Sequence, residues 1–220
     1  MVQVIGILGF KGSGKDTVGE YLVREHGYEV ESFANPLKDL LSAVFGWDRA
    51  LLEGNTVDSR EWRETPDEWW EAKLDWLAKT GNYLGRFTPR AAMQYIGTDV
   101  MRQHFDDSVW IKSLEARIRN KDKVVITDCR FPNECKLITH YNGLLFRVKR
   151  GPEPEWFEHA QGAAQGYVGN KVAMETLFPK IHISEWAWLS ENVDTIENDG
   201  SISDLYGKAS CLLKTHFTKS

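Results

Sequence analysis

The 220-residue sequence predicts an α/β fold of three layers, in which helices cover both faces of a central parallel sheet. Short apolar, β-branched runs alternate along the chain with longer segments of helical periodicity. A glycine-rich loop also connects the first apolar run directly to the first helical segment. The length fits one domain or one domain with a large insertion, so we treat residues 1–220 as a single domain.

The apolar runs are expected to form buried parallel strands, which read as nearly continuous apolar segments. The expected strands are Val2–Leu8, Tyr28–Phe33, Val124–Thr127, Leu144–Val148 and Thr195–Glu197. Helices are expected at Asp16–Glu25, from Pro36, at Asn133–Tyr141 and from about Ser203. In the helix from Pro36, one buried face is expected to carry Leu37, Leu40, Leu41 and Val44.

Two segments interrupt this alternation. Trp47–Phe87 is charged and rich in tryptophan, and we interpret it as the start of a mostly helical insertion over residues 47–120. Its tryptophans are expected to be packing anchors rather than platforms for base stacking, because aromatic side chains dominate small cores. Gly151–Lys180 contains three glycines and is expected to be irregular, either as a mobile lid over 151–180 or as an ordinary surface excursion.

Composition excludes several classes of protein. The formal net charge is −5, which does not favour stable binding to nucleic acid through a general basic surface. Three scattered cysteines with no metal-ligand spacing indicate reduced thiols in a cytoplasm. No signal pattern and no membrane-spanning apolar run is found, so we expect a soluble cytoplasmic protein without membrane partners.

The segment GFKGSGKDT, from Gly9 to Thr17, has the spacing of a phosphate-binding loop between a strand and a helix. Glycines allow backbone N–H groups to turn towards phosphates, and the following helix N-terminus attracts anions. Lys15 would place a positive charge on the β- and γ-phosphates of a nucleoside triphosphate. The expected phosphate-binding residues are Lys11, Gly12, Ser13, Gly14, Lys15, Asp16 and Thr17.

Asp16 stands where this motif usually has serine or threonine, whose hydroxyl binds Mg²⁺. A carboxylate there can bind Mg²⁺ directly or through water, accept a proton or fix an arginine. The structural alternative is an acidic residue that favours the helix dipole. We favour the metal or catalytic role because the position lies beside the phosphates.

A second group of polar residues follows the strand Val124–Thr127. Asp128 at its carboxyl end can face the nucleotide and contribute to the Mg²⁺ shell. Arg130 could stabilise the transferring phosphoryl group, and Glu134 could orient that arginine. The alternative is a structural Arg–Glu pair at a helix start. The segment argues against a GTPase, because a DxxG switch would need glycine where Phe131 stands.

The acceptor of a phosphoryl group needs its own anion site, and FTPRAAMQYIGTD is the best candidate. Thr88 and Pro89 begin a helix on which Arg90 and Gln94 share one face. Arg90 suits a monophosphate, and Gln94 can hydrogen-bond a base edge. Trp110 could stack a base, although a solvated arginine and a core tryptophan are the plain alternatives.

Taken together, several motifs resemble those of the bacteriophage deoxynucleoside monophosphate kinases. They run in order from residue 5 to about 208: GFKGSGKDT, FTPRAAMQYIGTD, VWIKSLEARI, VVITDCRFPNE, HISEW and NDGSISDL. The resemblance implies a P-loop kinase fold with a helical acceptor-binding insertion and a lid segment. It also implies transfer of a phosphoryl group from ATP to a deoxynucleoside 5′-monophosphate (dNMP) with Mg²⁺, and a homodimer.

The resemblance also implies roles for individual residues. The catalytic residues would be Lys15, Asp16, Arg130 and Glu134, and the acceptor would contact Arg90, Gln94, Trp110 and Asp128. Asp16 and Asp128 would hold the metal directly or through water. Lys149 and Arg150 would face the lid. If the gene is a phage's, the protein would act in the cytoplasm of the host cell.

Other functions remain open at this stage. Another small-molecule kinase, of the phosphomevalonate or dephospho-coenzyme A type, would share the loop. An ATPase switch or nucleic-acid motor would hydrolyse ATP without a phosphorylated small product. A non-catalytic nucleotide-binding module would leave Arg130 and Glu134 without a purpose.

Overall fold

The computed structural model describes residues 2–81 and 84–217, and the chain divides into two compact units. We call Met1–Phe33 together with Ile111–Ser220 the sheet unit, and Ala34–Trp110 the insertion unit. Residues 82 and 83, within the expected insertion, lie outside the described residues. The insertion unit takes in the helix that begins near Pro36 as well as the whole of the tryptophan-rich segment Trp47–Phe87.

The sheet unit is built on five parallel strands in the order β2-β3-β1-β4-β5, as the alternation of strands and helices predicted. Their bounds are β1 Gln3–Leu8, β2 Glu29–Glu31, β3 Lys123–Ile126, β4 Leu144–Lys149 and β5 Asp194–Glu197. The central strand β1 is flanked on both sides, with Ile5 opposite Val125 of β3 and Ile7 opposite Phe146 of β4. These four side chains are fully buried, which explains their continuous apolar runs.

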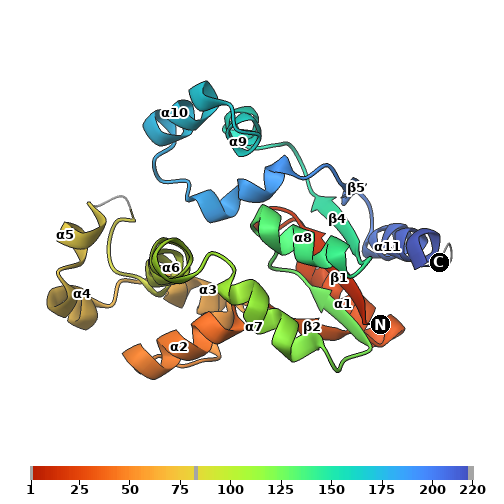
Figure 1. The fold of residues 1–220 in the computed structure, drawn as a ribbon, viewed down its shortest axis with the longest axis horizontal. Helices are drawn as coiled ribbons and strands as arrows, with labels where there is room; N and C mark the ends of the chain where they lie inside the picture. The colour runs from red at the N-terminus through yellow and green to blue at the C-terminus, as the bar shows by residue number, and fades with distance from the viewer. Residues whose placement is uncertain (1, 82–83, 218–220) are drawn as a thin grey trace. The chain divides into compact units, whose positions relative to one another are not determined.

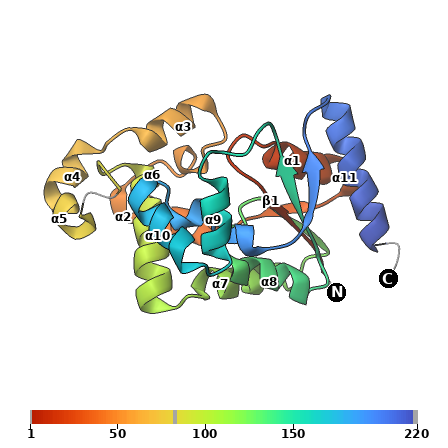
Figure 2. The ribbon, with the colours of Figure 1, turned by 90° about the horizontal axis from the view of Figure 1, so that it is seen from above.

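Helices cover both faces of this sheet (Figure 2). α1 (Lys15–His26) and α11 (Ile202–Phe217) pack together on one face, and α8 (Pro132–His140) lies on the other. Besides the helices of residues 151–180, this unit also contains α7 (Val109–Ile118, which begins at the end of the insertion unit), η3 (Ile183–Glu185) and η4 (Ala187–Ser190). The core joins both sheet and helices through residues such as Val18, Val148 and Leu205.

The segment 151–180 forms two packed helices, α9 (Phe157–Ala164) and α10 (Val168–Leu177), drawn in blue-green in Figure 1. The expectation of an irregular segment is therefore wrong. A Cβ on Gly162, inside α9, would lie 2.4 Å from Asn170 of α10. Glycine at this position therefore permits the two helices to pack closely. Gly166, with φ 93°, makes the turn between the helices.

The insertion unit is helical, as expected. Its elements are α2 (Asn35–Phe45), η1 (Leu51–Glu53), α3 (Val57–Glu64), α4 (Glu68–Leu74), α5 (Trp76–Thr80), α6 (Pro89–Gln94) and η2 (Tyr95–Phe105). η2 is a π-helix that continues α6 without a break. Such wide turns are rare and are frequent at functional sites.

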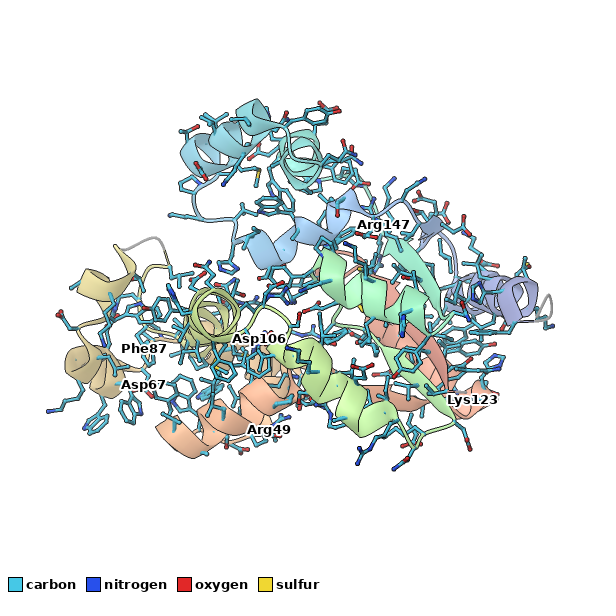
Figure 3. The ribbon with its side chains drawn as sticks, viewed as in Figure 1. Arg49, Asp67, Phe87, Asp106, Lys123 and Arg147 are labelled. Atoms are coloured by element: carbon cyan, nitrogen blue, oxygen red, sulfur yellow. The ribbon has the colours of Figure 1, made fainter. Side chains whose placement is uncertain are left out.

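Aromatic side chains form the core of the insertion unit around Phe87, which is 1% exposed and is labelled in Figure 3. Its ring lies 4.9 Å from that of Trp76 and 5.4 Å from that of Phe45, both edge to face. The indole of Trp47 donates a hydrogen bond to Asp67 at 2.8 Å. These contacts confirm the packing role predicted for the tryptophans; Trp69, which is 62% exposed, is the exception.

The buried face of α2 differs from the expectation. Leu37 and Leu41 are buried as predicted, and Phe45 continues the row one turn later. Leu40 and Val44 are 40% and 54% exposed. The apolar face of α2 is therefore wider than the part of it that packs against the rest of the insertion unit. The row Leu37, Leu41 and Phe45, spaced by four residues, is enough to fill the aromatic core.

Cys129 and Cys135 are buried free thiols, and burial raises the pKa of each.

Within residues 2–81 and 84–217, no helix combines the length and the apolar character needed to cross a membrane.

The aromatic core predicts a large effect of truncating Phe87. Phe87→Ala should lower the free energy of unfolding by about 3–5 kcal/mol, because it removes a buried ring and leaves a cavity. Leu77→Ala, at a side chain that is 51% exposed, is the control and should stay within roughly 0.5 kcal/mol. Denaturant unfolding measures both, and equal effects would contradict the central place of Phe87.

Candidate active site

The loop between β1 and α1 requires glycine at three positions. Gly9, Gly12 and Gly14 have φ values of 143°, 82° and 102°. A Cβ on Gly9 would also lie 2.4 Å from the backbone oxygen of Val148. The sequence motif therefore has a backbone reason: only glycine adopts this path beside β4.

Asn198, which follows β5, ties the loop to the sheet. Its Nδ2 donates to the backbone oxygen of Ser13 at 2.8 Å, and its own backbone N–H donates to the oxygen of Lys149 at 2.7 Å. A Cβ on Gly14 would lie 2.5 Å from the same Nδ2. Sequence reasoning assigned no role to Asn198, although its position directly after a strand was the available signal.

The loop residues differ in exposure. Lys11, Gly12 and Asp16 are exposed, whereas Ser13 is only 4% exposed. The Ser13 hydroxyl has no hydrogen-bond partner among the described residues. Buried polar atoms are normally paired, so an unpaired hydroxyl beside a phosphate-binding loop fits a position awaiting a ligand.

Lys15 is the first residue of α1, and its side chain is 18% exposed. Burial lowers the pKa of Lys15, while the carboxylate of Asp16 at 3.9 Å opposes this shift. Weaker effects come from Arg130, Glu185 and Asp128. Burial is thus the largest of these effects and outweighs the nearby carboxylates in setting the direction of the pKa shift of Lys15.

Asp128 lies two residues beyond β3, at the carboxyl end of the sheet. Its oxygens accept hydrogen bonds from the hydroxyl of Ser32 at 2.6 Å and from the backbone N–H of Phe33 at 3.1 Å. Ser32 is itself held through its backbone oxygen by Arg117 at 2.7 Å. The carboxylate is thus fixed in place, as a metal-shell or substrate-binding residue must be.

Arg130 and Glu134 lie on either side of the start of α8. Glu134 is buried, and its carboxylate accepts the backbone N–H groups of Arg130 at 2.7 Å and of Phe131 at 3.1 Å. These bonds cap the helix, so Glu134 shapes the backbone that carries Arg130. The Arg130 side chain instead pairs with Glu185 at 2.8 Å, a residue to which sequence reasoning gave no role.

The candidate lid residues lie at the end of β4, of which Lys149 is the last residue. Lys149 pairs with Glu197 at 3.2 Å, and Arg150 is exposed. The neighbouring Arg147, labelled in Figure 3, lies among aromatic rings, with its guanidinium carbon 5.3 Å from the ring centres of Phe10 and of Trp188. A small cavity of about 60 Å³ lies between this segment and the phosphate loop.

Three of the four predicted acceptor residues, Arg90, Gln94 and Trp110, lie in the insertion unit, whereas Asp128 lies in the sheet unit. Thr88 caps α6 as expected, and Arg90 pairs with Glu64 at 2.5 Å. Gln94 is half-buried at the end of α6. Trp110 is 8% exposed and donates to the backbone oxygen of Gly97 at 2.9 Å, which favours the packing alternative. Its role in base stacking stays a prediction.

A parallel sheet whose central strand leads through a glycine loop into a helix, with Lys15 at its first turn, defines a P-loop phosphotransferase. Comparison with known proteins specifies which one. Residues 71–166 match the family model of deoxynucleotide monophosphate kinase.

Two relatives carry corresponding names. A protein of Acanthamoeba polyphaga mimivirus, named for the same family, is 32% identical over 162 residues, which cover 67% of this chain and 74% of that protein. The deoxynucleoside-5′-monophosphate kinase of Escherichia phage T5 is 27% identical over 186 residues, covering 66% and 74%. The chain therefore belongs to the deoxynucleotide monophosphate kinase family.

A solved structure also follows the chain over most of its length. It is a gluconokinase from Sinorhizobium meliloti 1021, with 12% identity, a TM-score of 0.43 and coverage of 98% of this chain and 94% of the other.

We predict that the half-buried charge of Lys15 lowers the stability of the free protein but contributes to the binding of ATP. Because burial lowers the folded-state pKa of Lys15, its charged form costs stability below that pKa, and the cost diminishes as pH rises from that pKa towards the ordinary pKa of lysine. Lys15→Met should therefore leave the Tm of the free protein at or above the wild-type value and abolish the rise in Tm caused by ATP. Thermal unfolding with and without ATP measures both, and a preserved ATP-induced rise would contradict the assignment.

Proposed function

We propose that the protein transfers the γ-phosphate of ATP to a deoxynucleoside 5′-monophosphate, yielding the diphosphate and ADP. The observation that carries this proposal is the glycine loop, with Lys15 half-buried at its end and Arg130 acting on the same lysine through its charge. Membership in the family supports the choice of acceptor.

The donor half of the reaction belongs to the sheet unit. Backbone N–H groups at the start of α1 and the ammonium of Lys15 would bind the triphosphate. Asn198 and Gly9 keep the loop in its open path, so little reorganisation is needed when the nucleotide binds. Electrostatic preorganisation of this kind is a major contribution to phosphoryl transfer.

Mg²⁺ is part of the proposal. The described residues contain no group of three or more His, Cys, Asp or Glu that could hold a metal alone. That fits Mg²⁺, which is commonly bound by one or two carboxylates together with substrate phosphates and water. Asp16 and the fixed Asp128 are the carboxylates we assign to it, directly or through water. When bound, the ion would neutralise negative charge on the β- and γ-phosphates.

The acceptor half is assigned to Arg90, Gln94 and Asp128. The phosphate of a monophosphate is already ionised, so no strong general base is needed and catalysis is mainly positioning and charge stabilisation. Arg130 is the residue that we assign to the moving phosphoryl group, because its guanidinium can donate two parallel hydrogen bonds to spread negative charge. The resemblance also implies a homodimer, which sedimentation would test separately.

Product analysis tests the reaction. The protein, Mg²⁺ and ATP are incubated with each dNMP in turn, and with phosphomevalonate and dephospho-coenzyme A as rival acceptors. A deoxynucleoside diphosphate formed together with ADP is the expected result. A product from a rival acceptor only, or ATP hydrolysis without any phosphorylated acceptor, would overturn the proposal.

Two arginine variants separate the two halves of the site. Arg90→Ala should raise KM for the dNMP roughly 10- to 100-fold, the value of a lost charge-assisted hydrogen bond, with little change in KM for ATP. Arg130→Ala should lower kcat by about 10²–10³-fold because it removes charge stabilisation in the transition state. Steady-state kinetics with either substrate varied measures both.

Arg86→Ala is the matched control for Arg90, since this arginine of the same unit pairs with a glutamate in the same way but is 54% exposed and has no assigned role. It should leave both KM values unchanged. If Arg86→Ala and Arg90→Ala behave alike, or if Arg130→Ala keeps near wild-type turnover, the corresponding assignment is wrong.

A further inference from the structure

The segment HISEW contains a glutamate that holds Arg130 in one orientation. Nη1 of Arg130 donates to the Oε1 atom of Glu185 at 2.8 Å and to the backbone oxygen of Ser184 at 3.1 Å. The glutamate side chain is 27% exposed and the arginine side chain 39%. The pair is therefore partly shielded from water, where an ion pair is stronger than on an open surface.

The rest of the guanidinium remains available. Among the described residues, Nε and Nη2 of Arg130 have no hydrogen-bond partner. These two atoms form the side edge of the guanidinium, whose parallel N–H groups match two oxygens of one phosphoryl group. The anchored atom Nη1 lies at the opposite edge. Glu185 thus occupies the edge that a phosphoryl group does not need.

Glu185 is itself held in position by its neighbours. The ring nitrogen Nδ1 of His182 lies 2.8 Å from the hydroxyl of Ser184 and accepts the backbone N–H of Ser184 at 3.2 Å. The indole of Trp188 donates to the backbone oxygen of Glu185 at 3.0 Å, and its ring centre lies 5.1 Å from that of Phe10 in the phosphate loop. Through these contacts the segment connects Arg130 to the loop that binds the donor.

We propose that Glu185 is a positioning residue, which fixes Nη1 of Arg130 so that the Nε–Nη2 edge meets the transferring phosphoryl group. The inference rests on the proposed function, since it concerns how Arg130 acts. A free arginine side chain samples many rotamers, and the anchor removes most of that freedom before the substrates bind. The effect of the glutamate therefore belongs to the transition state rather than to the binding of either nucleotide.

Substitution of Glu185 tests the proposal. Glu185→Ala should lower kcat by about 10²-fold, the cost expected for a misplaced catalytic group, while KM for ATP and for the dNMP stays near wild type. Glu185→Gln keeps an oxygen that can accept the Nη1 hydrogen bond, so it should recover a large part of that loss. A structural role alone would instead lower Tm and the active fraction without this order of kcat values.

A double-mutant cycle with Arg130→Ala checks that Glu185 acts through Arg130. In the Arg130→Ala background, Glu185→Ala should have no further effect on kcat, because the group that it positions is absent. Additive losses would overturn the inference. Glu53→Gln is the matched control: Glu53 is also a partly buried carboxylate paired with Lys38 at 2.6 Å, and this variant should keep wild-type kcat.

The outcomes separate this inference from the function that it rests on. If Arg130→Ala loses turnover but Glu185→Ala keeps it, Arg130 is catalytic and the positioning role of Glu185 is wrong. If Arg130→Ala itself keeps wild-type turnover, the catalytic assignment of Arg130 fails, and the role of Glu185 fails with it. Thermal unfolding of each variant shows that the kcat values refer to folded protein.

Discussion

The hydrogen bond from Asn198 to the backbone oxygen of Ser13 is the interaction on which the phosphate loop depends. It brings the end of β5 against a loop that leaves β1, and the same asparagine is tied to the end of β4. Three strand ends therefore meet at one loop. The positive φ angles of Gly9, Gly12 and Gly14 are the backbone cost of this arrangement, and only glycine accepts them without strain.

The polar side chains around this loop differ in how completely they are paired. The charge of Lys15 is partly desolvated, and the Ser13 hydroxyl has no partner among the described residues. Both features reduce stability, and under the proposed function phosphate oxygens would compensate for them. Asp128 and Arg130, in contrast, are already fixed by Ser32 and Glu185. The candidate site thus combines a partly desolvated lysine and an unpaired hydroxyl with two side chains, Asp128 and Arg130, that hydrogen bonds hold in place.

The insertion unit is stabilised in a different way from the sheet unit. Its described residues, 34–81 and 84–110, form no sheet and its helices are short, so aromatic rings packed around Phe87 supply its core. Indole N–H groups of Trp47, Trp70 and Trp76 each donate a hydrogen bond to an oxygen, so that burying these rings leaves no indole N–H unpaired. This core supports α6, which carries Arg90 and Gln94, and its π-helical continuation η2.

Much of the site was predictable from local sequence, because local sequence encodes local backbone. The strand, glycine loop and helix from Gln3 to His26 follow from apolar periodicity and glycine spacing, and so do the five-stranded parallel sheet and the Thr88 cap. The position of Lys15 at the start of α1, and those of Asp128 and Arg130 beyond the end of β3, follow from the same reasoning. The predicted roles of these residues remain to be tested by the variants.

Tertiary structure alone decided which distant residues complete the site. Glu185 reaches Arg130 from 55 positions away and Asn198 reaches Ser13 from 185 positions away, and no periodicity marks such partners. Two further contacts could not be read from local sequence. Gly162 is needed inside α9 because Asn170 of α10 packs against it, and the indole N–H of Trp110 donates to the backbone oxygen of Gly97. The sequence by itself indicated the strands, the glycine loop and the start of α6, because apolar periodicity, glycine spacing and capping residues are local signals. Packing decided which side chains of α2 are buried and which polar groups pair across the fold.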